Sequence, residues 1–209
     1  MTNKLADQIS FLQEIDHLKG VLRATPIADN SRRENSAEHS WHIAMYALVL
    51  ADEAGPEVRI DRVIRMLLLH DIVEIDAGDM PIHEVHDAEA HAAKERAAAD
   101  RLFGLLPAAQ ATEFRALWDE FEAAETADAI FAKTIDRVQP LLLNLANGGG
   151  SWIDYDVTLD QIDDRVGEKV MRGAPALWHH VRARVAGFFA NQAASVPAPE
   201  AAHPEPRKP

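Results

Sequence analysis

The sequence contains no cysteine, and several other scarcities narrow what the protein can be. Without thiols the chain forms no disulfide and has no thiolate metal ligand, which fits a reducing compartment. No apolar run approaches the roughly 20 residues that span a bilayer. The first residues, Met1 to Lys4, lack the basic and apolar regions of a secretory signal. We therefore expect a cytoplasmic protein without a membrane partner.

Basic residues are also scarce. The chain has 21 Lys and Arg against 34 Asp and Glu, a formal net charge of -13. Binding a nucleic-acid polymer needs a basic surface, so nucleic acid is not an expected partner. A small phosphorylated substrate remains compatible, because a metal and a few local arginines attract one phosphate against an acidic background. The acidity itself is most simply explained by solvated helix faces.

Helical patterning runs through most of the chain, and neither a strand pattern nor an internal repeat is visible. Residues 4–22 carry apolar side chains at spacings of three and four. Further helices are expected at 41–54 (after a cap at Asn35), 58–70, 88–104, 111–124, 127–146, 159–170 and 174–192. The length suits a single all-α domain, residues 1–193. Residues 194–209 hold five prolines without apolar periodicity, which predicts a disordered tail.

Turn-forming residues mark three breaks between these helices. The first, around Pro26, ends at Arg32 and Arg33, immediately before Asn35. The second covers residues 76–87, and the third is the glycine-rich stretch 147–151. The last suits a solvent loop about as well as an active-site lid.

The most informative stretch is Leu67–Glu74, where an apolar run ends in adjacent His70 and Asp71. Neutral imidazole and ionised carboxylate are both good ligands for a divalent metal. His39, in the first turn of its helix, and Asp136, in an apolar helical stretch, extend the set to four. Taken singly, His70, Asp71 and His39 are more often ordinary surface or capping groups. Asp136 is harder to explain, because burying an unpaired carboxylate is costly.

Together, the order His, His-Asp, Asp across three helices resembles the HD-domain metal-dependent phosphohydrolases. Within that superfamily the chain is most similar to the bacterial 5'-deoxynucleotidase branch, which includes the HD-domain-containing protein 2 type. The resemblance runs from about residue 18 to 145 and is carried by Arg33-Glu34-Asn35-Ser36-Ala37-Glu38-His39-Ser40, His70-Asp71-Ile72-Val73-Glu74 with Asp79, Trp118-Asp119-Glu120-Phe121-Glu122 and Lys133-Thr134-Ile135-Asp136-Arg137.

The resemblance implies a helical bundle with one divalent metal at its centre, hydrolysis of (deoxy)nucleoside 5'-monophosphates, and a homodimer. Two imidazoles and two carboxylates suit a borderline metal such as Mn, Co, Fe, Ni or Zn. Glu74 lies one helical turn after Asp71, and the resemblance assigns catalysis to this position. Asp79 matches a carboxylate that helps to place water or substrate. A salt-bridging glutamate and a turn-forming aspartate are the ordinary alternatives.

Phosphate recognition needs fixed positive donors. Arg23 falls where the family has a substrate-contacting arginine, although Ala24 follows it where a family member has tryptophan. Arg32 and Arg33 precede the cap of the helix that carries His39. Lys133 lies one turn before Asp136 and would neutralise the site. For each of these cations, ordinary ion pairing is about as plausible as substrate contact.

Three further histidines, His83, His86 and His91, raise the alternative of a second metal, because dinuclear HD enzymes use extra histidines after the His-Asp pair. Their spacing matches no such pattern that we recognise, so we expect one metal. Two other functions stay open. One is hydrolysis of another phosphorylated small molecule, such as a guanosine polyphosphate. The other is a non-catalytic nucleotide-binding regulator, which the presence of Glu74 and Asp79 disfavours.

Overall fold

The computed structural model describes residues 3–82 and 87–195, and the statements below refer to this part of the chain. It is mostly helical, which confirms the all-α prediction. The α-helices are α1 (Lys4–Glu14), α2 (Ser36–Val49), α3 (Ile60–Leu69), α4 (Glu74–Ala77), α5 (Ala88–Phe103), α6 (Ala108–Ala123), α7 (Ala127–Ala146), α8 (Gly150–Asp154), α9 (Leu159–Ile162), α10 (Glu168–Gly173) and α11 (Pro175–Ser195). Within the described ranges, no helix is both long and apolar enough to cross a membrane.

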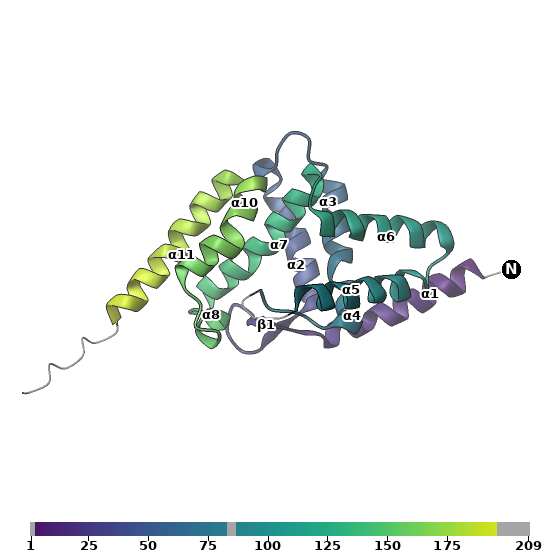
Figure 1. Ribbon diagram of the computed structural model, residues 1–209, viewed down its shortest axis with the longest axis horizontal. Coiled ribbons are helices and arrows are strands. Elements are labelled where there is room, and N and C mark those ends of the chain that lie inside the picture. Colours follow the sequence, from purple (N-terminus) through teal and green to yellow (C-terminus); the bar gives the residue numbers. More distant parts are fainter. Residues whose placement is uncertain (1–2, 83–86, 196–209) are drawn as a thin grey trace, which may run out of the picture.

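Helix α7 lies in the middle of the molecule, with α1 and α11 reaching toward opposite ends (Figure 1). It contacts α2, α3, α6, α10 and α11. The helix begins where the Thr126 side chain accepts a hydrogen bond from the backbone of Ala129, an N-cap that satisfies one otherwise unpaired donor. Residues on more than one side of α7 are buried, so the helix is central to the core. A polar side chain on a buried side of α7 therefore points into the bundle.

An ion pair between exposed Arg59 and buried Asp128 links the starts of α3 and α7. Asp128, in the first turn of α7, accepts hydrogen bonds from the backbone N–H of Arg59 at 2.7 Å and from its guanidinium at 2.6 and 3.0 Å. Arg59 immediately precedes α3, whose inner residues Val63, Met66 and Leu67 are fully buried. With both helices held at their starts, the end of α3 meets the middle of α7, where the candidate metal ligands lie.

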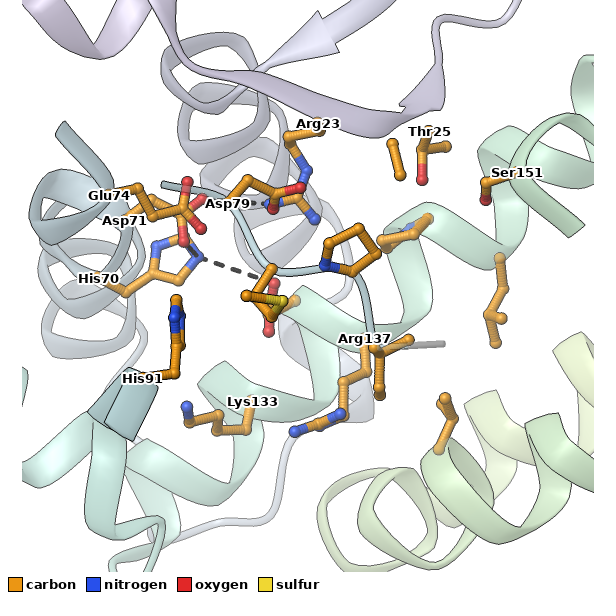
Figure 2. A pocket seen from close by; sticks show the side chains of 18 of the residues that line it. Arg23, Thr25, His70, Asp71, Glu74, Asp79, His91, Lys133, Arg137 and Ser151 are labelled. Atoms are coloured by element: carbon orange, nitrogen blue, oxygen red, sulfur yellow. Dashed lines mark hydrogen bonds and ion pairs between the residues drawn. The ribbon is translucent and has the colours of Figure 1, made fainter. Parts of the chain in front are cut away.

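The structure departs from the sequence prediction between the first two helices. Helix α1 ends at Glu14, and a 3-10 segment follows to Gly20. The expected loop then contains two antiparallel strands, β1 (Leu22–Pro26) and β2 (Arg33–Asn35). Strands of five and three residues are too short to show a convincing alternating pattern in the sequence. The hairpin matters for the site, because it carries one strand across the pocket (Figure 2).

Two C-terminal expectations also change. The break expected at 147–151 already contains the first two residues of α8, after Gly148 and Gly149 adopt positive φ angles of 81° and 113°. Helix α11 continues to Ser195, past the expected start of the tail at residue 194. The remainder of that predicted tail, residues 196–209, lies outside the described residues, so its disorder stays a prediction.

Candidate metal centre and active site

Three of the four predicted metal ligands converge inside the bundle. His39 comes from the first turn of α2, His70 follows the end of α3, and Asp136 lies in the middle of α7. Their ligand atoms all lie within 4.8 Å of one another. The Asp136 Oδ1 atom is 3.0 Å from His39 Nε2 and 3.7 Å from His70 Nε2. This is the only such cluster of metal-ligating side chains among the residues that the structure describes.

Both imidazoles are oriented by hydrogen bonds to their Nδ1 atoms. The His39 Nδ1–H donates to Gln139 Oε1 at 3.1 Å, and the His70 Nδ1–H donates to the Leu67 carbonyl at 2.8 Å. This arrangement leaves an Nε2 lone pair on each neutral ring facing Asp136. The His70 Nε2 is buried and makes no hydrogen bond. Lone pairs that face a carboxylate repel it unless a cation lies between them, so the residues fit a divalent metal.

In the absence of a cation, protons take over the same role. Burial by itself lowers the pKa of His70, but the carboxylates of Asp71 and Asp136 outweigh that effect and raise it to about 10. The pKa of His39 is also raised, because contacts with Asp136 and Glu34 outweigh burial and the charge of Arg23. A metal and these protons therefore compete for the same nitrogen lone pairs.

The fourth predicted ligand, Asp71, lies at the edge of this cluster. Its Oδ1 is 2.8 Å from His70 Nε2, while its Oδ2 is 3.4 Å from Arg23 Nη1. It is not part of the group whose ligand atoms all lie within 4.8 Å. The backbone at His70–Val73 forms a 3-10 turn rather than the continuous α-helix expected from the sequence, which changes the angle between successive side chains. A ligand role for Asp71 stays a prediction.

Two aromatic residues of α6 hold His70 in place. The Trp118 indole N–H donates to the His70 carbonyl at 3.2 Å, and the ring of Phe121 meets the imidazole edge to face at a centroid distance of 4.9 Å. These contacts fix the backbone and the ring of His70 where α3 gives way to the 3-10 turn. This explains why the sequence places two aromatic residues in one turn of a helix outside the metal cluster.

Carboxylates around Arg23 give this part of the site an excess of negative charge. The Arg23 guanidinium lies 3.3 Å from Asp79 and 3.6 Å from Glu34, in addition to its contact with Asp71. Burial alone would lower the Arg23 pKa, but Asp71 and Asp79 raise it and keep the group charged. Burial also raises the pKa of Asp79, despite the nearby guanidinium.

Glu74 is the carboxylate best suited to proton transfer. Burial, followed by the charges of Asp71 and Asp79, raises its pKa well above the ordinary value. The Ser36 hydroxyl donates to Glu74 Oε2 at 2.5 Å and opposes part of that rise. A buried, oriented carboxyl group that holds a proton more readily than usual can act as a general acid or base near neutral pH.

A cavity of about 320 Å³ opens beside these groups. Figure 2 shows Arg23, Asp71, Glu74, Asp79 and His70 at one end of it. Lys133 and Arg137 also belong to its wall, together with His91. Apolar side chains also line it, namely Ile82, Pro140, Leu141, Trp152, Tyr155 and Val166. The pocket thus combines charged groups with apolar surface.

Not all predicted cations reach the pocket. Arg23 and Lys133 line it, but Arg32 and Arg33 do not. Arg32 forms an ion pair with Glu38 at 2.8 Å on the surface, and Arg33 is exposed. The alternation of strand β2 explains the position of Arg33, because it turns Arg33 outward and Glu34 inward. The ordinary ion-pairing alternative therefore describes the observed position of Arg32.

Sequence reasoning missed three polar residues that support the site. Glu34 is 2% exposed and accepts a hydrogen bond from Gln139 Nε2 at 2.8 Å. Burial opposes ionisation of Glu34, yet hydrogen bonds from His39 and His42 lower its pKa to about 2. Gln139 follows Asp136 by one helical turn, a spacing that would have identified it. Ser36, whose partner is 38 residues away, offered no comparable signal.

The histidines considered for a second metal are only partly covered. His83 and His86 lie outside the described residues. His91 lines the pocket, where its Nε2 is 3.2 Å from Glu95 Oε1.

The family model described as HD domain matches residues 15–178, most of the chain. The chain belongs to the HD domain family. Its architecture agrees with a crystal structure of a predicted metal-dependent phosphohydrolase from Magnetospirillum magnetotacticum MS-1, at 51% identity and a TM-score of 0.85, covering 90% of this chain and 97% of that one. An HD-domain phosphohydrolase from Listeria innocua, at 15% identity and a TM-score of 0.57, shares the fold.

Curated relatives of this HD domain protein include 5'-deoxynucleotidase HDDC2 from Bos taurus, 33% identical over 136 residues. That match covers 64% of each chain, so the aligned part spans less than two thirds of the bovine protein. A second relative, 5'-deoxynucleotidase plu3092 from Photorhabdus laumondii, is 24% identical over 167 residues. That match covers 76% of this chain and 84% of the relative. Membership of this family implies a divalent metal, and the His39, His70 and Asp136 cluster is where the described residues would hold it.

Proposed function

We propose that the protein is a metal-dependent phosphohydrolase that removes the phosphate from (deoxy)nucleoside 5'-monophosphates. The observation that carries the proposal is the convergence of His39, His70 and Asp136, beside a pocket that Glu74 lines together with the last two. The similarity to proteins named 5'-deoxynucleotidase supports the substrate class. One divalent metal of the Mn, Co, Fe, Ni or Zn type would be held by His39, His70 and Asp136. Asp71 would join them after a small movement of its side chain.

Such a metal, when bound, polarises a phosphoryl oxygen and lowers the pKa of a coordinated water. The protein's own groups supply the rest of the chemistry. Glu74 takes a proton from the attacking water and returns a proton to the leaving 5'-oxygen, a role that its raised pKa suits. Asp79, held 3.3 Å from Arg23, orients water or substrate at the mouth of the site. Arg23 offers a guanidinium that stays charged to the phosphate.

The apolar part of the pocket lining suits a nucleoside. Tyr155 provides aromatic surface for a base, and the buried Trp152 lies beside it in the wall of the pocket. Ala24 lines the pocket where a family member has tryptophan. We infer that aromatic contact with the nucleoside comes from α8 in this chain rather than from the strand β1.

The direct test is phosphate release by protein that has been stripped with a chelator and reloaded with Mn or Co. The panel contains deoxy- and ribonucleoside 5'-monophosphates, a 3'-monophosphate, a cyclic diester and a guanosine polyphosphate. Glu74→Gln removes the proton-transfer group at almost constant size, and Glu89→Gln, at an exposed position of α5, is the matched control. Release confined to 5'-monophosphates and lost in Glu74→Gln supports the proposal. Silence across the panel, with metal and nucleotide still bound, would instead identify a nucleotide-binding regulator.

The homodimer and the cytoplasmic location belong to the same proposal. The terminal helix α1 exposes Leu5, Ile9 and Leu12, at 62%, 46% and 62% of their surface. An apolar face of this kind supports association with a second copy. Light scattering of the purified protein at micromolar concentration would show a mass of twice 23.1 kDa if the dimer forms.

A further inference from the structure

A second cavity of about 290 Å³ lies on the far side of Lys133 and Arg137 from the catalytic groups. Its wall contains those two residues together with Lys169 and Arg172, and a single acidic side chain, Glu122. Four cations to one carboxylate is the reverse of the overall balance, since the chain carries a net charge of -13. Positive charge concentrated in a concave place on an acidic protein attracts anions locally.

The fold builds this concentration from two helices. Lys133 and Arg137 are one turn apart on α7, and Lys169 and Arg172 are three residues apart on α10. The helices approach closely at Gly173, the last residue of α10, where an added Cβ would collide with Thr134 Oγ1 on α7. The two pairs of cations therefore face one space because a glycine allows the helices to come together.

These cations are incompletely neutralised. Lys133 forms an ion pair with Glu122 at 2.8 Å, and Arg172 reaches only the Ala124 carbonyl at 3.4 Å. Arg137 makes no hydrogen bond or ion pair with any described residue, and its buried Nε has no partner. A buried guanidinium nitrogen without an acceptor is costly, so the site gains when an anion supplies one. The pKa of Lys169 is also lowered, first by the charge of Arg137, then by burial and by the charge of Lys133.

We propose that Lys133, Arg137, Lys169 and Arg172 form a phosphate-binding subsite beside the catalytic pocket. Lys133 and Arg137 line both cavities, so a phosphate here would lie next to a substrate bound at the metal centre. The occupant is a phosphate group from one of two sources: a second phosphate of the substrate itself, or a free phosphate ion. The neighbouring catalytic site is that of the proposed function, but binding of phosphate to the subsite does not depend on turnover.

The test uses Lys169→Gln/Arg172→Gln, because both residues are exposed and neither lines the catalytic pocket. Titration calorimetry with inorganic phosphate is carried out on the metal-loaded full chain and repeated after removal of the metal. We expect a binding step that persists without metal and weakens at least about tenfold in the double variant, since charge-assisted contacts are lost. Arg96→Gln, an exposed cation of α5 away from both cavities, should leave it unchanged. Equal phosphate binding by all three proteins overturns the subsite.

Kinetics distinguish the two sources. If the substrate supplies the phosphate, a deoxynucleoside 3',5'-bisphosphate has a lower KM than the 5'-monophosphate, and the double variant removes that difference while keeping turnover of the monophosphate. If free phosphate is the occupant, the bisphosphate shows no advantage, yet the metal-independent binding step remains. A protein that binds phosphate in this way but hydrolyses nothing would refute the proposed function and leave the subsite intact. A bisphosphate advantage that survives in the double variant would refute the substrate source.

Discussion

The Ser36 hydroxyl donates a hydrogen bond to the Glu74 carboxylate at 2.5 Å, joining the first residue of α2 to the first residue of α4. Both groups are buried, at 0% and 9% exposure. The bond favours the ionised form of a carboxyl group whose pKa is otherwise raised by burial and by Asp71 and Asp79. Ser36 therefore lowers the pH range in which Glu74, the proposed proton-transfer group, becomes ionised.

Ser36→Ala should shift the pH dependence of kcat toward higher pH. Without the donated bond the Glu74 pKa rises further, so a higher pH is needed to form the carboxylate that accepts a proton from water. We expect kcat near neutral pH to fall about tenfold, with activity recovering as the pH increases. The pH–rate profile of the metal-loaded protein provides the measurement.

Ser40→Ala is the matched control for that experiment. Ser40 lies one turn further along α2, is 3% exposed, and its hydroxyl has no hydrogen-bond partner. Its removal should leave the pH profile unchanged and the stability equal or slightly higher. A profile that moves equally in both variants would show that the helix, rather than the Ser36 bond, controls the site.

Elements with strong local signals were predictable from the sequence. Helix α7 has the expected bounds, 127 to 146, because a threonine cap precedes it and a glycine-rich run follows it. The capping box at Asn35 and Glu38 is also present as expected. Adjacent His70 and Asp71 directed attention to the centre of the bundle, and three of the four predicted ligands meet there.

The remaining features of the site depend on tertiary contacts, which produce no periodic pattern in the sequence. Glu34 and Gln139 are 105 residues apart, and only the folded chain shows that they support His39 together. The hairpin of β1 and β2 is too short for a strand signal, yet it decides that Arg23 faces the pocket while Arg32 faces solvent. The cations of α10 had no motif to mark them.

Metal binding at neutral pH should release at least one proton per metal ion. The His70 pKa of about 10 in the metal-free chain means that this ring carries a proton near pH 7, which a metal must displace. Calorimetric titrations in buffers with different ionisation enthalpies give the number released. Asp136→Asn removes a carboxylate that raises this pKa and should reduce both the proton release and the affinity. Heats that do not depend on the buffer would contradict a protonated His70 in the metal-free chain.

Stability should respond to pH in opposite directions with and without metal. In the metal-free chain the His70 pKa is raised from 6.5 to about 10, so this contribution to the free energy of unfolding is complete below about pH 6.5 and is lost as the pH rises toward 10. The metal requires neutral rings, so its stabilisation increases over the same interval. The difference in Tm between loaded and stripped protein should therefore widen from pH 6.5 upward, measured by calorimetry.

Gln139→Leu should weaken metal binding without removing a ligand. The substitution deletes the acceptor for the His39 Nδ1–H and the donor to Glu34, both in the interior. Loss of an outer hydrogen bond to a ligating histidine typically costs 10- to 100-fold in affinity, and the unpaired buried groups cost about 1–3 kcal/mol in stability. Competition with a chelator and denaturant unfolding measure the two effects. Gln13→Leu, at an exposed position of α1, should change neither.

Gly173→Ala should separate α10 from α7 and weaken the proposed phosphate subsite. The added Cβ would collide with Thr134 Oγ1 and lie 3.0 Å from the Ile130 carbonyl, so the helices must move apart at a cost of about 1–3 kcal/mol. Gly187→Ala is the matched control, since it lies inside α11 with no atom within 4 Å of the new Cβ. That control should gain up to about 1 kcal/mol from helix propensity. If Gly173→Ala proved as stable as the control and bound phosphate normally, the close approach of the helices would not be what brings the four cations together.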